Sequence, residues 1–269
     1  MGHQAGQGAT ARPQGPKREG AAPPLPRLGR PAAALAGTTP ACGVVLVLPT
    51  GAEASARRPS PLVRAAVAPF ARSLGKACAP KGVLVHVVHY RLGGWNGDDA
   101  ELSADARWAA DEAVRRYGDV PVCLAGYGMG GRAALHAAGH QAVNSVVALA
   151  PWLPDDGLAA PAEPVRQLLG RHVLIVHGSN DRRVDPELSY RLAERAKKTN
   201  RDTCRFEVRG DGHALRGHHR EVAALTKDFA LGALLPRAFS RPVEDALAAP
   251  PPLGLRMPLA TGFGRTLTD

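Results

Sequence analysis

The chain has 269 residues, of which 45% are hydrophobic, and this is enough for one large domain with a full apolar core. No apolar run reaches the roughly 18 residues that a membrane-spanning helix needs, so we expect no contact with a membrane. The formal net charge is +10, but only 4% of the residues are aromatic and no basic stripe alternates with them, which argues against nucleic-acid binding.

The N-terminal segment, residues 1–41, is rich in proline, glycine, alanine and arginine and lacks apolar periodicity. Such a composition predicts a disordered arm, and it contains no apolar stretch typical of a secretory signal, so we expect a cytoplasmic protein. The four cysteines, Cys42, Cys78, Cys123 and Cys204, are widely separated and form no C-x-x-C pair. We therefore expect free thiols, with no metal site and no cofactor.

The folded part, predicted over residues 42–235, begins as an alternation of strands and helices. An apolar strand over residues 43–48 ends at a Pro-Thr-Gly turn, and a helix over residues 61–76 follows, with apolar residues at helical spacing. A Pro-Lys-Gly break precedes the next strand, and Ser103 caps a long helix that reaches Tyr117.

The alternation continues to about residue 235 and predicts six strands with about six helices. The predicted strands cover residues 43–48, 83–88, 122–125, 143–149, 172–176 and 205–208. Such a repeat is typical of an α/β protein with a mostly parallel sheet and helices on both of its faces. Residues 236–269 return to proline, alanine and arginine, and we expect them to form a C-terminal extension.

Residues 121–139 have the layout of a sharp strand–turn–helix junction. Their sequence, PVCLAGYGMGGRAALHAAG, reads as an apolar strand, a glycine-rich turn and an alanine-rich helix. In the motif G-x-S-x-G the middle residue attacks the substrate, and the flanking glycines let strand and helix pack closely. Gly126 and Gly130 occupy the flanking places here, so Gly128 stands in the place of the nucleophile and has no side chain.

Two ionisable residues come just after later strands. Asp181 lies four residues beyond His177 in the pattern H-G-x-x-D, although it could instead cap the following helix, and Asp185 competes for the same role. We interpret His177 itself as part of a strand-end turn. His213 follows the strand over residues 205–208, with an exposed loop histidine as the alternative. The order elbow, acid, histidine is that of a hydrolytic triad.

The motif and this order, with each group after the carboxyl end of a strand, resemble the α/β-hydrolase superfamily, in particular its small lidless esterases and dienelactone-hydrolase-like members. The resemblance covers about residues 42–235 and departs from the family pattern at Gly128. It implies an oxyanion hole built from the backbone N–H of Met129 and of Gly51 or Ala52. Many relatives have His-Gly in that second loop, where this chain has Thr-Gly.

The pocket implied by the resemblance includes Tyr127 and has Trp152 at its rim. Two functions remain open. In the first, His213, oriented by Asp181, acts as a general base on water that attacks a reactive ester, lactone or similar carbonyl. In a weaker version of the same hypothesis, a serine from another loop, such as Ser179, supplies the nucleophile. In the second, the protein is a catalytically silent member of the fold that binds a small carbonyl-containing molecule or a protein partner.

Overall fold

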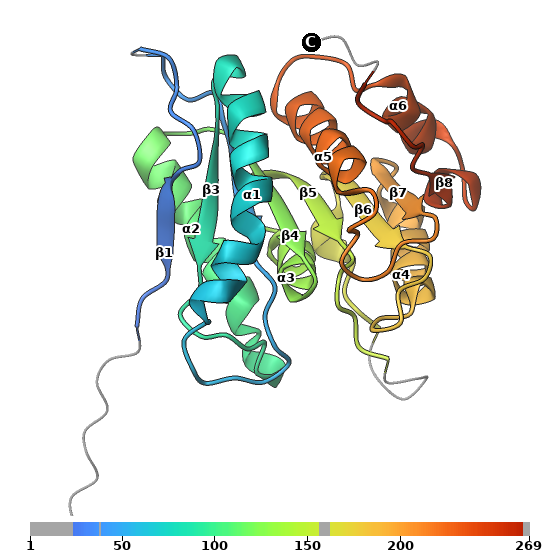
Figure 1. Ribbon diagram of the computed structural model, residues 1–269, viewed down its shortest axis with the longest axis horizontal. Helices are drawn as coiled ribbons and strands as arrows, with labels where there is room; N and C mark the ends of the chain where they lie inside the picture. The colour runs from blue at the N-terminus through green and yellow to red at the C-terminus, as the bar shows by residue number, and fades with distance from the viewer. Residues whose placement is uncertain (1–23, 38, 156–161, 266–269) are drawn as a thin grey trace, which may run out of the picture.

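An eight-stranded sheet runs through the molecule, in the order β1-β3-β2-β4-β5-β6-β7-β8 (Figure 1). The computed structural model describes residues 24–37, 39–155 and 162–265. The strands are β1 Arg27–Pro31, β2 Gly43–Leu48, β3 Val83–His89, β4 Val122–Tyr127, β5 Val143–Leu149, β6 His172–Gly178, β7 Thr203–Val208 and β8 Met257–Pro258. Every neighbouring pair is parallel except β1, which runs antiparallel to β3 at one edge.

Six α-helices in the described part of the chain cover the sheet on both faces. They are α1 Pro61–Cys78, α2 Glu101–Tyr117, α3 Met129–Ala137, α4 Pro186–Thr199, α5 His219–Leu234 and α6 Arg241–Ala248, with short 3-10 turns at Ala79–Lys81, Gly97–Asp99, Arg166–Leu168 and Leu253–Leu255. Helices α1, α5 and α6 share one apolar core with the sheet, and α2, α3 and α4 share the other. In Figure 1, α1 and α5 stand in front of the sheet.

Both faces of the central strands are buried, which explains their continuous apolar sequences. In β2, Val44 and Leu46 belong to the core shared with α2 and α3, whereas Val45 and Val47 belong to the core shared with α1 and α5. Alternate residues of a strand point to opposite faces, so a strand that is covered on both sides must be apolar throughout. The mostly parallel α/β sheet predicted from these runs is confirmed.

The predicted number of strands was too low, because the two edge strands have weak sequence patterns. β1 has the sequence RLGRP, with Leu28 as its one large apolar side chain, and lies in the segment for which we expected disorder. It is ordered by pairing with β3, and His86 Nδ1 lies 2.8 Å from the Gly29 carbonyl oxygen. β8 has only two residues and pairs with β7. Residues 1–23 of the predicted arm lie outside the described residues.

The C-terminal extension packs against the rest of the domain. Helix α6 places Val243 and Ala246 in the core that α1 and α5 also share, and Leu255 and Leu259 are buried after it. Burial of these apolar side chains contributes to the stability of the end of the sheet formed by β7 and β8.

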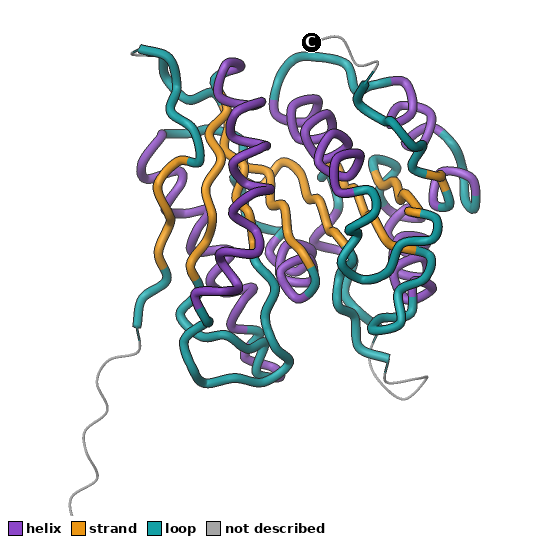
Figure 2. Tube along the Cα trace, in the orientation of Figure 1, coloured by secondary structure: helices purple, strands orange, loops and turns teal. Residues whose placement is uncertain are grey.

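Parallel strands end at the same edge of a sheet, and the loops that follow them gather there. Figure 2 shows such loops as the teal segments below the lower ends of β3, β5 and β6, which Figure 1 labels. This edge carries the elbow, the acid and the histidine predicted from the sequence. Among the described residues, no helix combines the length and hydropathy that a bilayer span requires.

Candidate active site

Gly128 forms the tip of a sharp turn between β4 and α3. Its φ is 56° and its ψ is −120°, a conformation that costs a residue with a side chain about 1–3 kcal/mol. Its N–H donates to the Leu149 carbonyl oxygen at 2.9 Å, and its own carbonyl oxygen accepts from the Trp152 N–H at 2.9 Å. The end of β5 therefore holds the turn in place from both sides.

The two flanking glycines allow strand and helix to approach closely. A β-carbon on Gly126 would overlap the Gly130 carbonyl group, and one on Gly130 would overlap the carbonyl oxygen of Leu48 in β2. The backbone of α3 therefore lies directly on the ends of β2 and β4. This close approach aims the N-terminus of α3, and with it the Met129 N–H, at the carboxyl edge of the sheet.

The structure brings His213 and Asp181 together although 31 residues separate them in the sequence. The His213 Nδ1 lies 2.7 Å from the Asp181 Oδ2, and the Tyr127 hydroxyl donates to the His213 carbonyl oxygen at 2.5 Å. The other ring nitrogen, Nε2, lies 3.6 Å from the position that a β-carbon on Gly128 would occupy. No hydrogen bond from a described residue reaches Nε2, so this nitrogen faces the space above the elbow with its lone pair unused.

The Asp181 carboxyl group is ionised. Burial by itself raises its pKa, but the hydrogen bonds that the carboxylate accepts outweigh burial and hold the pKa well below its usual range. Its Oδ1 accepts from the backbone N–H groups of Arg183, at 2.8 Å, and Val184, at 3.2 Å. A carboxylate fixed in this way holds His213 as the Nδ1–H tautomer. Asp185, the competing acid, instead caps α4 by accepting from the Glu187 N–H.

His177 is a site residue that we had interpreted only as part of a turn. Its Nε2 lies 3.0 Å from the Asp181 Oδ2, and its Nδ1 lies 2.9 Å from the hydroxyl of Ser189 on α4. Burial lowers the pKa of the His177 imidazole, so the ring is neutral, and its Nε2–H donates to the ionised Asp181. The H-G-x-x-D spacing contained this signal, because a histidine four residues before an acid at a strand end can fold back onto it.

The Asp181 carboxylate is thus shared between two histidines, one buried and one facing the elbow. Behind His177, the guanidinium of Arg205 donates from Nε to the Ser189 Oγ at 3.0 Å. Arg205 itself is buried and also pairs with Glu207 at 2.7 Å. A chain of polar contacts therefore runs from the interior beside α4 to the ring of His213.

The expected oxyanion donors are only partly in position. The Met129 N–H points at the Thr50 Oγ1, 3.4 Å away. The Ala52 N–H donates to the Gly93 carbonyl oxygen at 2.8 Å, so the proposal of Ala52 as a donor was wrong. A short bridge between Ala52 and Gly94 ties this loop to the loop after β3. Gly51 remains the candidate for the second N–H.

Neither Ser179 nor Cys123 takes the place of a nucleophile at residue 128. The Ser179 hydroxyl accepts from the Gly210 N–H at 3.0 Å and makes no hydrogen bond with His213. Cys123 lies inside β4, and burial raises the pKa of its thiol to about 12, which keeps it protonated. Trp152 touches the elbow through its backbone, whereas its ring lies 5.3 Å from the Arg132 guanidinium.

A cavity of about 850 Å³ opens between α1 and α5 and reaches the elbow. Thr50, Tyr127 and Ala214 line it at the elbow end, and Phe70 and Val222 lie among the mainly apolar side chains of the two helices. Such a size and lining suit a small organic molecule. In the described part of the chain, no group of three His, Cys, Asp or Glu side chains is placed to hold a metal ion.

No protein-family model and no curated protein matches the chain. Solved structures match it in fold. The Pyrococcus furiosus esterase Pf2001 is 14% identical, with a TM-score of 0.55 over 72% of this chain and 82% of the esterase. Est1E from Butyrivibrio proteoclasticus, solved with ferulic acid bound, is 16% identical, with a TM-score of 0.53 over 77% of this chain and 94% of Est1E.

A putative dienelactone hydrolase from Klebsiella pneumoniae subsp. pneumoniae is 20% identical, with a TM-score of 0.51 over 75% of this chain and 89% of that protein. The mostly parallel sheet covered by helices on both faces agrees with these likenesses in fold. The chain has the α/β-hydrolase fold.

Proposed function

We propose that this protein hydrolyses a reactive ester, lactone or similar carbonyl compound with water as the nucleophile and His213 as the general base. The observation that carries the proposal is the unpartnered Nε2 of His213, which faces the space above Gly128 while the ionised Asp181 holds the opposite nitrogen. A base that is oriented on one side and free on the other is the arrangement that general-base catalysis needs.

In the proposed reaction, the His213 Nε2 takes a proton from a water molecule as the water oxygen forms a bond with the carbonyl carbon. The ring becomes an imidazolium, which the adjacent Asp181 carboxylate stabilises. The tetrahedral intermediate then loses its alcohol, and His213 returns the proton to the departing oxygen. No acyl-enzyme forms, because Gly128 offers no atom that could carry one.

The cavity between α1 and α5 supports a substrate whose carbonyl group lies near Thr50 and whose apolar part lies along the two helices. One of the fold neighbours is named an esterase and another is named a putative dienelactone hydrolase, which supports ester and lactone carbonyls as the substrate class. A cytoplasmic location stays a prediction.

A second candidate function is favoured by Thr50. Its Oγ1 sits against the Met129 N–H, the group that would otherwise stabilise an oxyanion. With the nucleophile missing and this donor occupied, the pocket would bind a small carbonyl ligand or a protein partner without turnover. This alternative predicts ligand binding in the same cavity and no hydrolysis.

Hydrolysis of p-nitrophenyl acetate separates the two functions. We expect slow turnover by the wild type and its loss in His213→Ala. His140→Ala is a matched control, because His140 forms a second histidine–aspartate pair, with Asp111 at 2.9 Å, away from the elbow. An equal rate in wild type and His213→Ala would overturn the catalytic proposal, and so would labelling of the wild type by a fluorophosphonate probe, which requires an activated serine.

A further inference from the structure

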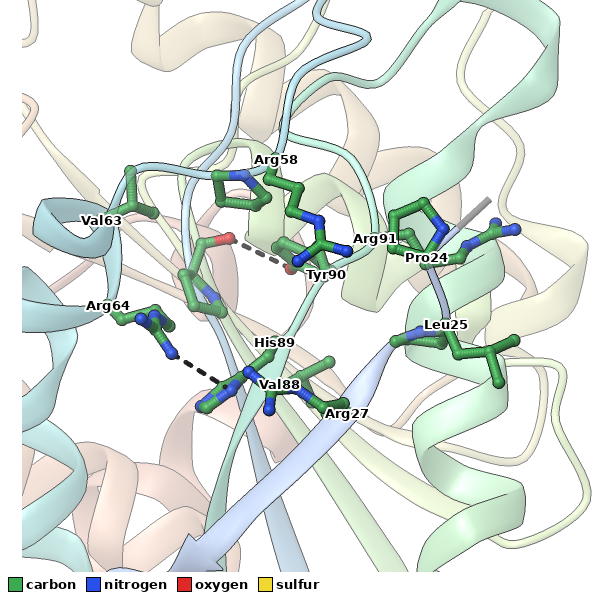
Figure 3. A pocket seen from close by; sticks show the side chains of 13 residues that line it. Pro24, Leu25, Arg27, Arg58, Val63, Arg64, Val88, His89, Tyr90 and Arg91 are labelled. Carbon is green, nitrogen blue, oxygen red and sulfur yellow. Dashed lines mark hydrogen bonds between the residues drawn. The ribbon is translucent and has the colours of Figure 1, made fainter. Parts of the chain in front are cut away.

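A second cavity, of about 650 Å³, adjoins the cavity between α1 and α5 at Val63 and is lined by arginines (Figure 3). It is formed by the start of β1, the end of β3, the loop before α1 and the first turn of α1. Its cationic residues are Arg27, Arg58, Arg64 and Arg91, and His89 is beside them. Figure 3 shows Arg58 reaching in from the loop and Arg64 from the helix.

Three of these guanidinium groups have no acidic partner among the described residues. Arg91 is neutralised, since its Nε pairs with Asp105 and its Nη2 with Glu101, both at 2.5 Å. Arg27, Arg58 and Arg64 form no ion pair with any described residue. Their positive charges therefore line the cavity without compensation from the residues that the structure describes.

A hydrogen bond to His89 fixes the orientation of the Arg64 side chain in the cavity. Its Nη1 donates to the His89 Nδ1 at 3.3 Å, a contact drawn in Figure 3. Burial, followed by the charges of Arg64 and Arg27, lowers the pKa of His89, so the ring is neutral and its Nδ1 accepts this hydrogen bond. The other guanidinium nitrogens of Arg64 remain for a ligand.

The N-terminus of α1 adds to the positive potential. The helix has 18 residues, begins at Pro61 beside the cavity, and carries no acidic residue in its first turn. The aligned peptide dipoles of a helix place about half a positive charge at this end. An acidic side chain near this end would offset that charge, whereas this helix carries Arg64.

The three unpaired guanidinium groups come from three separate segments of the chain. This arrangement favours a phosphoryl group over a carboxylate as the bound anion. A carboxylate has two oxygens in one plane and is satisfied by a single guanidinium fork, whereas a phosphoryl group has three terminal oxygens that point in different directions. The remaining walls are apolar and include Pro49, Pro59, Val63 and Val88. They suit an organic group attached to the phosphate.

We propose that this cavity binds a small phosphate monoester, with the phosphoryl dianion held by Arg27, Arg58 and Arg64 and the organic part packed on the proline and valine side chains. The site is separate from His213 and does not depend on the proposed hydrolysis. Pro49 joins the two sites, because it lines this cavity and directly precedes Thr50, which lines the other.

Calorimetric titration with phenyl phosphate tests the proposal, with benzoate and phenol as ligands of similar shape and lower charge. We expect the wild type to bind phenyl phosphate and to bind benzoate at least about tenfold more weakly. Arg58→Gln and Arg64→Gln should each weaken phenyl phosphate binding at least about tenfold. Arg64→Lys, which keeps the charge and loses the fork, should fall between wild type and Arg64→Gln.

The matched control is Arg72→Gln, an exposed arginine on the same helix that does not line the cavity. It should bind phenyl phosphate as the wild type does. The proposal fails if the wild type does not bind phenyl phosphate, if the double variant Arg58→Gln/Arg64→Gln binds it unchanged, or if Arg72→Gln weakens binding equally. Binding of duplex DNA without binding of phenyl phosphate would also overturn the proposal, since the arginines would then bind a polyanion and not a small phosphate monoester.

Discussion

The Thr50 Oγ1 lies 2.6 Å from the position that a β-carbon on Gly128 would occupy. The threonine hydroxyl therefore stands where a nucleophilic serine would place its side chain, beside the Met129 N–H. The glycine at residue 128 and the presence of Thr50 beside it are two parts of one local arrangement. A serine at residue 128 alone would meet both the positive φ and this hydroxyl.

The Gly128→Ser substitution tests this arrangement. We expect the single variant to lose about 1–3 kcal/mol of unfolding free energy, because serine must adopt a positive φ. Labelling by a fluorophosphonate should be slow in the single variant and faster in Gly128→Ser/Thr50→Ala, where the hydroxyl is gone. His213→Ala added to the double variant should abolish labelling. Faster labelling of the single variant than of the double variant would show that Thr50 does not obstruct the elbow.

His177 predicts a measurable dependence of stability on pH. Its folded pKa lies below the unfolded value of about 6.5, so the unfolded state binds the proton more readily and stability falls as the pH drops below 6.5. His177→Gln keeps an N–H donor and cannot take up a proton. Its unfolding free energy should therefore decline less than that of the wild type between pH 7 and pH 5, by at most about 2 kcal/mol.

Urea unfolding at the two pH values measures this difference. His86 and His89 also have lowered pKa values through burial, so the variant should retain part of the decline. The exposed His219 supplies the control, and His219→Gln should decline as the wild type does. If His177→Gln and the wild type decline equally, His177 does not remain neutral in the folded protein.

The C-terminal segment should matter for stability. Deletion of residues 236–269 removes the buried side chains of Val243, Ala246, Leu255 and Leu259. Each buried apolar side chain contributes about 1.5–3 kcal/mol, so the loss should be on the order of 5 kcal/mol or more. A shorter deletion, of residues 266–269, is the control. Thermal unfolding measures both, and an unchanged midpoint in the long deletion would contradict the packing of α6.

The sequence predicted the six central strands and missed the two edges for a physical reason. A strand buried on both faces, such as β2, must be apolar throughout, and that pattern is visible in the sequence. An edge strand needs only backbone pairing with its neighbour. β1 therefore has almost no pattern of its own and depends on β3, which is distant in the sequence.

The candidate site was predictable in its order along the chain but not in its contacts. The position of Asp181 and His213 just after strand ends indicated that they form an acid–histidine pair. In the structure, the His213 Nδ1 lies 2.7 Å from the Asp181 Oδ2. The obstruction by Thr50 and the pairing of the Ala52 N–H with Gly93 depend on how two loops lie against each other. No local pattern in the sequence encodes such a contact.

The buried Arg205 links the C-terminal segment to the candidate site. Its Nη1 donates to the Leu255 carbonyl oxygen at 2.9 Å, while its Nε holds the Ser189 hydroxyl beside His177. If about the last thirty residues detached, the Arg205 guanidinium would lose the Leu255 carbonyl as a partner. The series of polar contacts from Arg205 to His213 would then be weakened at its start. Attachment of the C-terminal segment and the orientation of the proposed base are therefore connected through hydrogen bonds, and release of this segment would weaken the support of His177 at the candidate site.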